Sequence, residues 1–466
     1  MKTEQKDMRR RDFLKVLGAG AVTSAATLYG CGDNEKTAGN AAANVGTRGE
    51  ADGSQMTYRT SKCGDKVSLL GYGCMRWPMT KDSKGEDVPD QEQINRLIDY
   101  ALAHGVNYFD TAPVYVRGLS EQATGIALKR HPRDKYFIAT KLSTQGRAGQ
   151  KVSREFSIDM YRNSFKELQT DYIDYYLLHN VTGEQAYRDR FLENGMIDFL
   201  LKEKEAGRIR QLGWSFHGQQ EGFDWLLSDA CGIPWDFVQI QMNYVDWKHA
   251  SGANVPAEYL YGELHKRNIP AVLMEPLQGG RLSALPDHVV TTLKSRDPEG
   301  SVASWAFRFA GTPPGVLTAL SGMTYMEHLQ DNLHTYCPLH PLTDADNAFL
   351  EEVAQLILKY PTIPCNNCDY CMPCPYGVDI PGILLHYNKC VNEGTMPESS
   401  QDPNYRKLRR DYLIGYDRAV SEKLRQASHC TGCNECTPFC PQYIRIPQQL
   451  QRIDKFIEDL RQGRPF

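Results

Sequence analysis

Two short stretches near the C-terminus concentrate cysteine, a residue whose thiolate binds metals and iron–sulfur clusters. The chain holds 14 cysteines, and eight of them lie in "CNNCDYCMPCP" (365–375) and "HCTGCNECTPFCP" (429–441). The second stretch has the spacing C-x2-C-x2-C-x3-C-P, in which three thiolates in a tight loop hold one cubane cluster and the fourth reaches a second cluster. The first stretch has one residue fewer before its last cysteine. The spacing therefore predicts two [4Fe–4S] clusters.

Because the fourth cysteine of each stretch is expected to bind the cluster of the other stretch, the eight thiolates divide into two predicted sets. One set is Cys365, Cys368, Cys371 and Cys440, and the other is Cys430, Cys433, Cys436 and Cys374. Zinc ribbons use paired C-x2-C units rather than three such steps in series, and cysteines three apart form disulfides poorly. Zinc and disulfides therefore stay open as minor alternatives. The isolated thiols are interpreted as structural: Cys63, Cys74, Cys231, Cys337 and Cys390.

A second group of reactive residues lies in the first half of the chain. Asp110, Lys141 and His179 each close an apolar run, and Tyr115 lies in the loop after Asp110. A tyrosine can donate a proton to a carbonyl oxygen during hydride transfer if a nearby cation lowers its pKa from about 10. Lys141 supplies that cation, Asp110 pairs with the buried lysine, and His179 orients the carbonyl oxygen. Each residue alone also has a structural interpretation, as a cap, a surface lysine or a core histidine.

These residues require elements that bring strand ends together, and the sequence predicts them. Eight short apolar runs alternate with helical periodicity over about 290 residues, which is the count and size of a (β/α)8 barrel. The predicted strands are 67–71, 106–110, 136–141, 173–179, 209–215, 237–241, 269–275 and 316–322, and helices are predicted at 90–105, 154–169, 256–268 and 344–364. A doubly wound open sheet is the competing fold, but the first strand is not followed by G-x-G-x-x-G.

The ends of the chain differ from this middle part. Residues 1–31 place Arg10 and Arg11 before an Ala/Gly-rich apolar run that is too short to span a bilayer, as in a twin-arginine signal peptide. Cys31 follows "LYG" and matches a lipoprotein cleavage site, so lipidation and release as a soluble product both stay open. We interpret 32–56 as a flexible linker, 57–344 as the barrel and 345–466 as a small, mainly α-helical cluster-binding domain.

Composition narrows the classes of partner. The net charge is −4 and 41% of residues are hydrophobic, so the chain can bury a large core and carries no excess of basic residues for phosphates. Nucleic acid is therefore excluded as a predicted partner, and a membrane is expected only through a lipid anchor. The expected partners are a small carbonyl or alcohol substrate and a redox protein or membrane electron carrier.

The first half of the chain resembles the aldo/keto reductase superfamily. The resemblance rests on "GVNYFDTAPVYVRGLSE", "ATK" and "YLLH", and it spans about residues 58–335. It implies that Asp110, Tyr115, Lys141 and His179 form the family's catalytic tetrad. It also implies carbonyl/alcohol oxidoreduction with NADP or NAD at the mouth of the barrel.

The resemblance further implies positions for the nicotinamide cofactor. These are Ser215 and Gln239 at the carboxamide, Pro276, Leu277, Gly279 and Gly280 at the pyrophosphate, and Gly322, Met323, His328 and Asn332 at the adenosine end. Phe216 stands where many members have Asn, and Met274 where they have an aromatic residue. Gly322 and His328 replace the usual Lys and Arg for the 2′-phosphate, so the choice between NAD and NADP stays open.

The cysteine stretches resemble the branch of the family with a C-terminal ferredoxin-like domain. The leading hypothesis is therefore an exported oxidoreductase on the periplasmic face of the membrane, in which hydride chemistry is coupled to one-electron transfer through two clusters. An alternative is an electron-transfer or interaction protein whose barrel is a catalytically idle scaffold. A third is an ordinary reductase with purely structural clusters.

Overall fold

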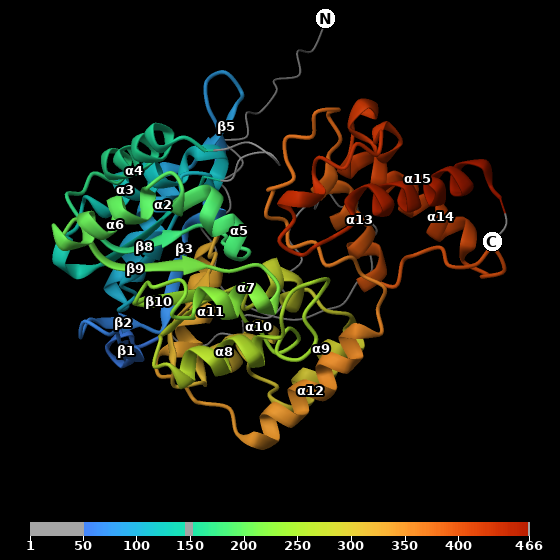
Figure 1. The fold of residues 1–466 in the computed structure, drawn as a ribbon. Helices are drawn as coiled ribbons and strands as arrows, with labels where there is room; N and C mark the ends of the chain where they lie inside the picture. The colour runs from blue at the N-terminus through green and yellow to red at the C-terminus, as the bar shows by residue number, and fades with distance from the viewer. Residues whose placement is uncertain (1–50, 145–151, 465–466) are drawn as a thin grey trace, which may run out of the picture. The chain divides into compact units, whose positions relative to one another are not determined.

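The structure is a computed structural model that describes residues 51–144 and 152–464 (Figure 1). Its largest feature is a closed barrel of eight parallel strands in the order β10-β11-β12-β3-β6-β7-β8-β9. The strands are β3 (Leu70–Gly73), β6 (Tyr108–Asp110), β7 (Phe137–Leu142), β8 (Ile173–Leu178), β9 (Ile209–Ser215), β10 (Phe237–Gln241), β11 (Ala271–Met274) and β12 (Val316–Ser321). The predicted (β/α)8 barrel is confirmed.

The barrel strands form where apolar runs can be buried on both faces. Every residue of β6, β8, β10 and β12 is buried, as expected for a parallel sheet that is filled inside and covered by helices outside. Tyr108, Tyr175 and Phe237 are fully buried in one hydrophobic cluster contributed by alternate barrel strands. The strands therefore enclose a packed core, with the functional side chains at their ends.

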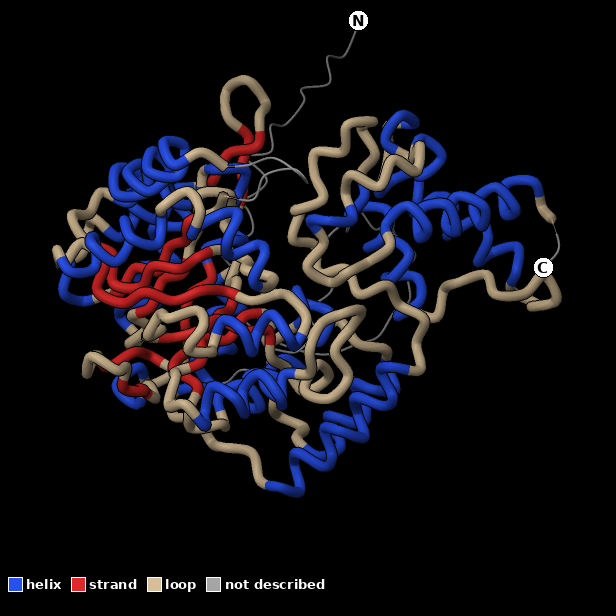
Figure 2. Tube along the Cα trace, in the orientation of Figure 1, coloured by secondary structure: helices blue, strands red, loops and turns tan. Residues whose placement is uncertain are grey.

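Helices surround the strands, as the tube in Figure 2 shows. They are α2 (Gln91–Ala103), α3 (Ser120–Leu128), α4 (Arg154–Leu168), α5 (Glu184–Tyr187), α6 (Met196–Glu205), α7 (Gln220–Leu226), α8 (Ala257–Lys266), α9 (Asp287–Arg296), α10 (Val302–Gly311) and α11 (Met326–Tyr336). Short helices are η1 (Gly53–Gln55), η2 (Cys74–Arg76), η3 (Tyr115–Gly118), η4 (Arg133–Lys135), η5 (Arg188–Leu192) and η6 (Gln278–Ser283). Asp90 and Ser153 accept backbone hydrogen bonds at the starts of α2 and α4, so polar caps set these boundaries.

The first predicted strand was placed too early. Residues 66–68 belong to an antiparallel hairpin of β1 (Tyr58–Thr60) and β2 (Lys66–Ser68), and the first barrel strand begins at Leu70. A continuous apolar run cannot show where one strand ends and the next begins. A second hairpin, β4 (Met79–Lys81) with β5 (Asp87–Pro89), follows β3. Met56, which precedes β1, is 5% exposed and packs in the barrel core.

The C-terminal part begins with α12 (Asp344–Leu358), whose buried residues Leu350, Val353 and Ala354 belong to the barrel's core. A separate core starts at Ile363 and is formed largely by α13 (Ile380–Asn392), α14 (Tyr405–Ala419) and α15 (Ile446–Gln462). Short helices η7 (Lys423–Arg425) and η8 (Ala427–His429) lead into the second cysteine stretch, and η9 (Thr437–Phe439) lies within it. We call residues 363–464 the cysteine module.

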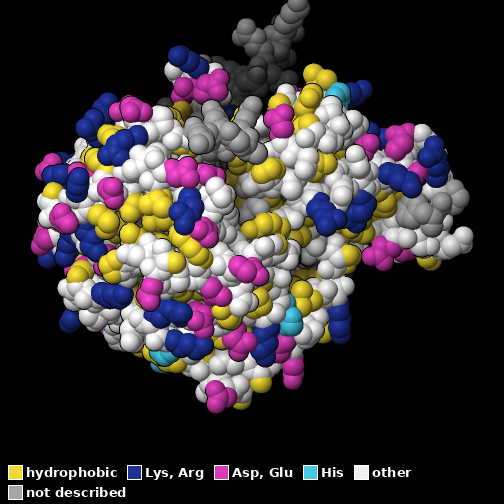
Figure 3. All heavy atoms as spheres, in the orientation of Figure 1, with side chains coloured by type: hydrophobic (Ala, Val, Ile, Leu, Met, Phe, Trp, Pro, Cys, Tyr) yellow, Lys and Arg dark blue, Asp and Glu magenta, His cyan; other side chains and the backbone are white. Residues whose placement is uncertain are grey.

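Two further observations concern the surface. None of the helices within 51–144 and 152–464 combines the length and apolar character needed to cross a bilayer. Basic and acidic side chains are interspersed on the face shown in Figure 3. The predicted signal segment 1–31 and the linker as far as residue 50 lie outside the described residues.

Candidate active site and cysteine module

A fully buried ion pair lies at the ends of two adjacent barrel strands. Lys141 on β7 donates from Nζ to Asp110 Oδ1 at 2.5 Å and to the Thr111 carbonyl oxygen at 2.8 Å. Burial lowers the pKa of Lys141 and raises that of Asp110, while the charge of each group opposes the shift of the other. A buried charge is retained only when it is paired and hydrogen-bonded, so the two residues depend on one another.

Tyr115 lies against this pair on η3. The Lys141 Nζ atom is 4.8 Å from the centroid of the Tyr115 ring, which is a cation–π distance. Burial, together with the nearby Tyr370 and Asp110, raises the pKa of Tyr115 well above its ordinary value. A lowered tyrosine pKa was expected from the sequence, whereas in this arrangement burial is the main cause of the shift and raises the pKa. In this arrangement Tyr115 keeps its proton and is a hydrogen-bond donor.

His179 follows β8 and is held from both sides. Its Nδ1 lies 2.5 Å from Ser143 Oγ, and Arg190 Nη2 donates to its carbonyl oxygen at 2.6 Å. Burial, reinforced by the positive charges of Lys141 and Arg190, lowers the pKa of His179 well below its ordinary value. The imidazole is therefore neutral. When the Ser143 hydroxyl donates to Nδ1, the proton of the ring sits on Nε2 and faces the mouth of the barrel.

Tyr370 of the first cysteine stretch enters the same site. Its hydroxyl oxygen lies 3.3 Å from His179 Nε2, and Tyr370 is close enough to Tyr115 to help raise the pKa of that residue. Tyr370 stands between Cys368 and Cys371, so a loop of the cysteine module reaches the tetrad. His179 and Tyr115 were predicted as site residues, whereas Tyr370 was not.

The end of the site proposed for the nicotinamide carboxamide contains unpaired acceptors. Gln239 Oε1 and Asn180 Oδ1 are buried without a hydrogen-bond partner, and Ser215 Oγ accepts from the Asn180 backbone N–H at 2.8 Å. Two orphaned amide oxygens suit a ligand that offers N–H donors, as a carboxamide does. Phe216 packs in the core against Trp214 and Phe223, with ring centroids 5.5 and 5.0 Å away, so it does not line this end.

The predicted pyrophosphate loop lies under the first cysteine stretch. Gly279 faces Asn366 so closely that an added Cβ would lie 2.3 Å from the Asn366 carbonyl oxygen. Glu275, at the start of the loop, accepts from Asn366 Nδ2 at 2.8 Å, and burial raises its pKa to about 7. Pro276, Leu277 and Gly280 belong to the same loop. The residues present therefore suit the nicotinamide end of a dinucleotide, whereas Asn366 covers the loop along which its pyrophosphate would lie.

The residues predicted at the adenosine end have varied roles. Asn332 Nδ2 donates to Ser321 Oγ at 2.9 Å and so holds the end of β12. Met323 is 1% exposed, and His328 is an exposed ring beside the exposed Tyr325. An added Cβ on Gly322 would lie 3.1 Å from Arg76 Cδ. Arg76 is therefore a cation beside this end, although the sequence pattern did not single it out.

The thiols of the predicted first cluster set are neighbours. Burial raises the pKa of Cys368 and of Cys371 above its ordinary range, and the charges of Cys365 and Cys440 raise it further. Backbone N–H groups also point to Sγ in Cys365, Cys368 and Cys440. Nearby thiols that receive backbone hydrogen bonds fit the requirements of an iron–sulfur cluster.

The second predicted set is less complete in its contacts. Burial raises the pKa of Cys436 to about 11, with smaller contributions from the charges of Cys430 and Cys433. In the part of the chain that the structure describes, no three His, Cys, Asp or Glu side chains converge on a point suited to a single metal ion. The ligands of a cubane bind irons at different corners and need not converge in that way.

The residues after Cys440 also bind the barrel. Gln442 Nε2 donates to Gln241 Oε1 at 2.9 Å, and Asn254 Nδ2 donates to the Pro441 carbonyl oxygen at 3.0 Å. Gly252 lies so close to Tyr443 that an added Cβ would be 2.8 Å from Tyr443 Cβ. Both cysteine stretches are thus attached to loops of the barrel.

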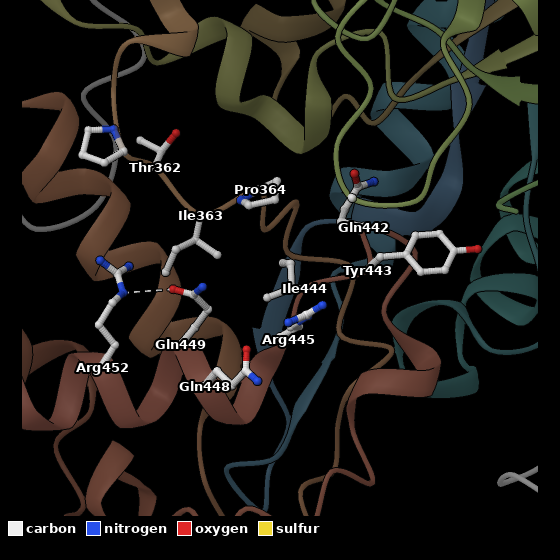
Figure 4. A pocket seen from close by; sticks show the side chains of 12 residues that line it. Thr362, Ile363, Pro364, Gln442, Tyr443, Ile444, Arg445, Gln448, Gln449 and Arg452 are labelled. Atoms are coloured by element: carbon white, nitrogen blue, oxygen red, sulfur yellow. Dashed lines mark hydrogen bonds between the residues drawn. The ribbon is translucent and has the colours of Figure 1, made fainter. Parts of the chain in front are cut away.

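A cavity of about 430 Å³ lies beside these attachments (Figure 4). Its walls come from Gly252, from residues 361–364 and 442–445, and from the start of α15. Arg452 Nε donates to Gln449 Oε1 at 3.1 Å across its edge. The tetrad does not line this cavity, so it is separate from the active site.

Comparison with known families identifies the barrel. Residues 69–355 match the model of the aldo/keto reductase family, which is more than half of the chain. The chain belongs to the aldo/keto reductase family. Its tetrad residues thus lie within the matched region, and the cysteine module follows it.

Similar aldo/keto reductases are known in several organisms. The chain is 33% identical over 156 residues to the probable aldo-keto reductase 1 of Glycine max, a match that covers 33% of this chain and 42% of the relative. It is 24% identical over 281 residues to the uncharacterized oxidoreductase YqkF of Bacillus subtilis, covering 57% and 86%. The chain thus spans less than half the length of the first of these relatives.

Solved structures show the same fold. The aldo-keto reductase AKR11C1 from Bacillus halodurans, in its holo form, superposes with a TM-score of 0.51 at 24% identity, covering 64% of this chain and 96% of that one. An aldo-keto reductase from Klebsiella pneumoniae, solved in complex with NADPH, has a TM-score of 0.49 at 21% identity, with 64% and 96% coverage.

Several site residues were missed by the sequence analysis. Asn180 directly follows His179 at a strand end, and this position was a usable signal. Ser143 and Arg190 act through His179, and Tyr370 and Asn366 belong to a stretch interpreted only as cluster ligands. Their roles depend on contacts between distant parts of the chain, which a single sequence does not show.

Proposed function

We propose that this aldo/keto reductase interconverts a small carbonyl compound and its alcohol, with Tyr115 as proton donor, and exchanges single electrons through two [4Fe–4S] clusters. The observation that carries the proposal is the contact of Tyr370 with His179 and Tyr115, because it joins the tetrad to a loop that bears three of the predicted cluster ligands. An idle barrel would not need a buried Lys141–Asp110 pair.

The residues of the barrel have separate tasks in this reaction. Tyr115 donates its proton to the carbonyl oxygen, and Nε2 of His179 orients that oxygen. Lys141 and Asp110 hold the Tyr115 ring through the ion pair beneath it. A nicotinamide nucleotide, when bound, supplies or accepts the hydride. Ser215, Gln239 and Asn180 would hold its carboxamide.

The cysteine residues would hold the clusters in the two crossed sets, with Cys440 completing the first and Cys374 the second. We further propose export by the twin-arginine route, with Cys31 as the site of lipid attachment and the periplasmic face of the membrane as the location. A small carbonyl or alcohol is the proposed substrate, and a redox protein or membrane electron carrier is the proposed partner. The division into a barrel at 57–344 and a cluster domain at 345–466 remains part of this proposal.

Anaerobic purification followed by iron analysis and single-turnover kinetics tests the proposal. Two clusters predict about eight irons per chain. Tyr115→Phe should lower the rate of carbonyl reduction by a factor of about 10²–10⁴, as expected for loss of general acid catalysis, and leave the iron content unchanged. Tyr376→Phe is the matched control, because Tyr376 is 50% exposed in the same module. An unchanged rate in Tyr115→Phe would reject the assignment.

A further inference from the structure

The position of the Tyr370 hydroxyl is that of a substrate oxygen. In carbonyl reduction the oxygen of the substrate accepts hydrogen bonds from the proton donor and from the orienting histidine. Here the Tyr370 hydroxyl oxygen lies 3.3 Å from His179 Nε2, and the two rings have centroids 6.1 Å apart. A carbonyl oxygen and this hydroxyl therefore need the same space.

Asn366, four residues earlier, covers the neighbouring loop in the same way. An added Cβ on Gly279 would lie 2.3 Å from the Asn366 carbonyl oxygen and 2.7 Å from its Cα. The surfaces are in direct contact, with no room for a methyl group. A pyrophosphate bound along this loop would have to replace Asn366.

Specific bonds hold these residues on the barrel. Arg76 Nη2, in the loop after β3, donates to the Asn366 carbonyl oxygen at 2.7 Å. Asn366 Nδ2 donates to Glu275 Oε1 at 2.8 Å, and Arg281 Nη2 donates to Thr362 Oγ1 at 3.0 Å. Loops from two sides of the barrel mouth therefore clamp the segment, and the contact is more than a chance approach.

We propose that the 365–371 loop is a built-in occupant of the active site, which excludes both the carbonyl substrate and the pyrophosphate of the nicotinamide nucleotide until it moves away. The inference rests on the proposed function, because the excluded ligands are those of the oxidoreductase. The loop carries Cys365, Cys368 and Cys371, so three of the residues that would hold the first cluster lie in the same segment that closes the site.

The first test needs no nucleotide. Gly279 and Gly280 have φ angles of 68° and 102°, so alanine strains the backbone at both positions. Only at Gly279 does the new methyl group meet Asn366, whereas at Gly280 the nearest atom lies 4.0 Å away. Hydrogen exchange of the anaerobically purified full chain should therefore rise at least about tenfold in residues 363–371 of Gly279→Ala, and stay near wild type in Gly280→Ala. Equal exchange in the two variants would overturn the proposal.

The second test measures competition with NADPH as the probe. The double variant Asn366→Ala, Tyr370→Phe loses the bonds to Glu275 and His179 but keeps every cysteine. It should bind NADPH about tenfold more tightly than wild type, and Tyr376→Phe should bind like wild type. Equal affinity in the double variant and wild type would overturn the closure of the site. If neither protein binds NADPH or NADH while Gly279→Ala still releases the loop, the nicotinamide part of the proposed function fails and the occupied site stands.

Discussion

Replacement of Lys141 by methionine tests the buried ion pair most directly. Lys141 is fully buried, and Nζ donates to Asp110 Oδ1 and to the Thr111 carbonyl oxygen. Methionine fills a similar volume but offers no donor, and Asp110 Oδ2 already lacks a partner. Removal of one member of a buried pair leaves an uncompensated charge, which typically costs about 3–5 kcal/mol of stability. Lys141→Met should therefore unfold at a distinctly lower temperature than wild type.

The penalty should depend on pH in a defined direction. Burial already raises the pKa of Asp110, and loss of Lys141 removes the main charge that opposes this shift. A carboxyl whose pKa is higher in the folded than in the unfolded protein lowers the stability of the fold once the pH exceeds the unfolded pKa, which is about 3.9 for Asp. This loss of stability reaches its full size when the pH exceeds the folded pKa. The difference in unfolding temperature between Lys141→Met and wild type should thus shrink as pH falls from 7 toward about 4.

Thermal unfolding followed by circular dichroism, under anaerobic conditions and between pH 4 and 8, measures this difference. Lys129→Met is the matched control, since Lys129 is exposed and substitutions at such sites usually change stability by less than about 0.5 kcal/mol. The reasoning would be refuted if the unfolding temperature of Lys141→Met fell no further than that of this control, or if its decrease did not change with pH. Asp110 would then be uncharged in the native protein.

Two further predictions concern a second buried acid and the crossing cluster ligand. Burial raises the pKa of Glu121 from 4.5 to about 7, so the folded protein loses stability as pH rises through this range. Glu121→Gln should raise the free energy of unfolding by about 3 kcal/mol at pH 8 and have little effect below pH 4. Thermal unfolding measures this change, and a difference between variant and wild type that is the same at every pH would contradict the raised pKa. Cys440→Ser should remove a ligand of the first cluster and lower the iron content by about half, whereas Cys63→Ser, at an exposed thiol, should not. Unchanged iron in Cys440→Ser would exclude Cys440 as a ligand.

The barrel could be predicted because each of its strands is a short apolar run between helices with clear periodicity. The predicted run 237–241 coincides with β10, and 209–215 coincides with β9. The exception is 67–71, where two strands share one apolar stretch and a hairpin precedes the barrel. Periodicity shows that a segment is buried on both faces, but it does not show which neighbour it pairs with.

The site was predictable to the extent that its residues lie at strand ends. Parallel strands present their carboxyl ends at one edge, so Asp110, Lys141 and His179 had to come close together. The direction of the Tyr115 pKa shift could not be predicted, since it depends chiefly on how deeply the folded chain buries the ring. Asn180 was missed because its unpaired Oδ1 is a property of the folded environment.

The sequence by itself determined the chemistry that is available: a tyrosine, a lysine–aspartate pair and a histidine for proton transfer, and eight cysteines spaced for clusters. Only the tertiary structure decided that these two sets meet. Tyr370 and His179 are 191 positions apart in the chain, and the hydroxyl and the imidazole meet at 3.3 Å because loops of the barrel hold the 365–371 loop through Arg76 and Glu275. Local spacing controls which ligands one loop can offer, whereas packing between distant loops decides which site that loop enters.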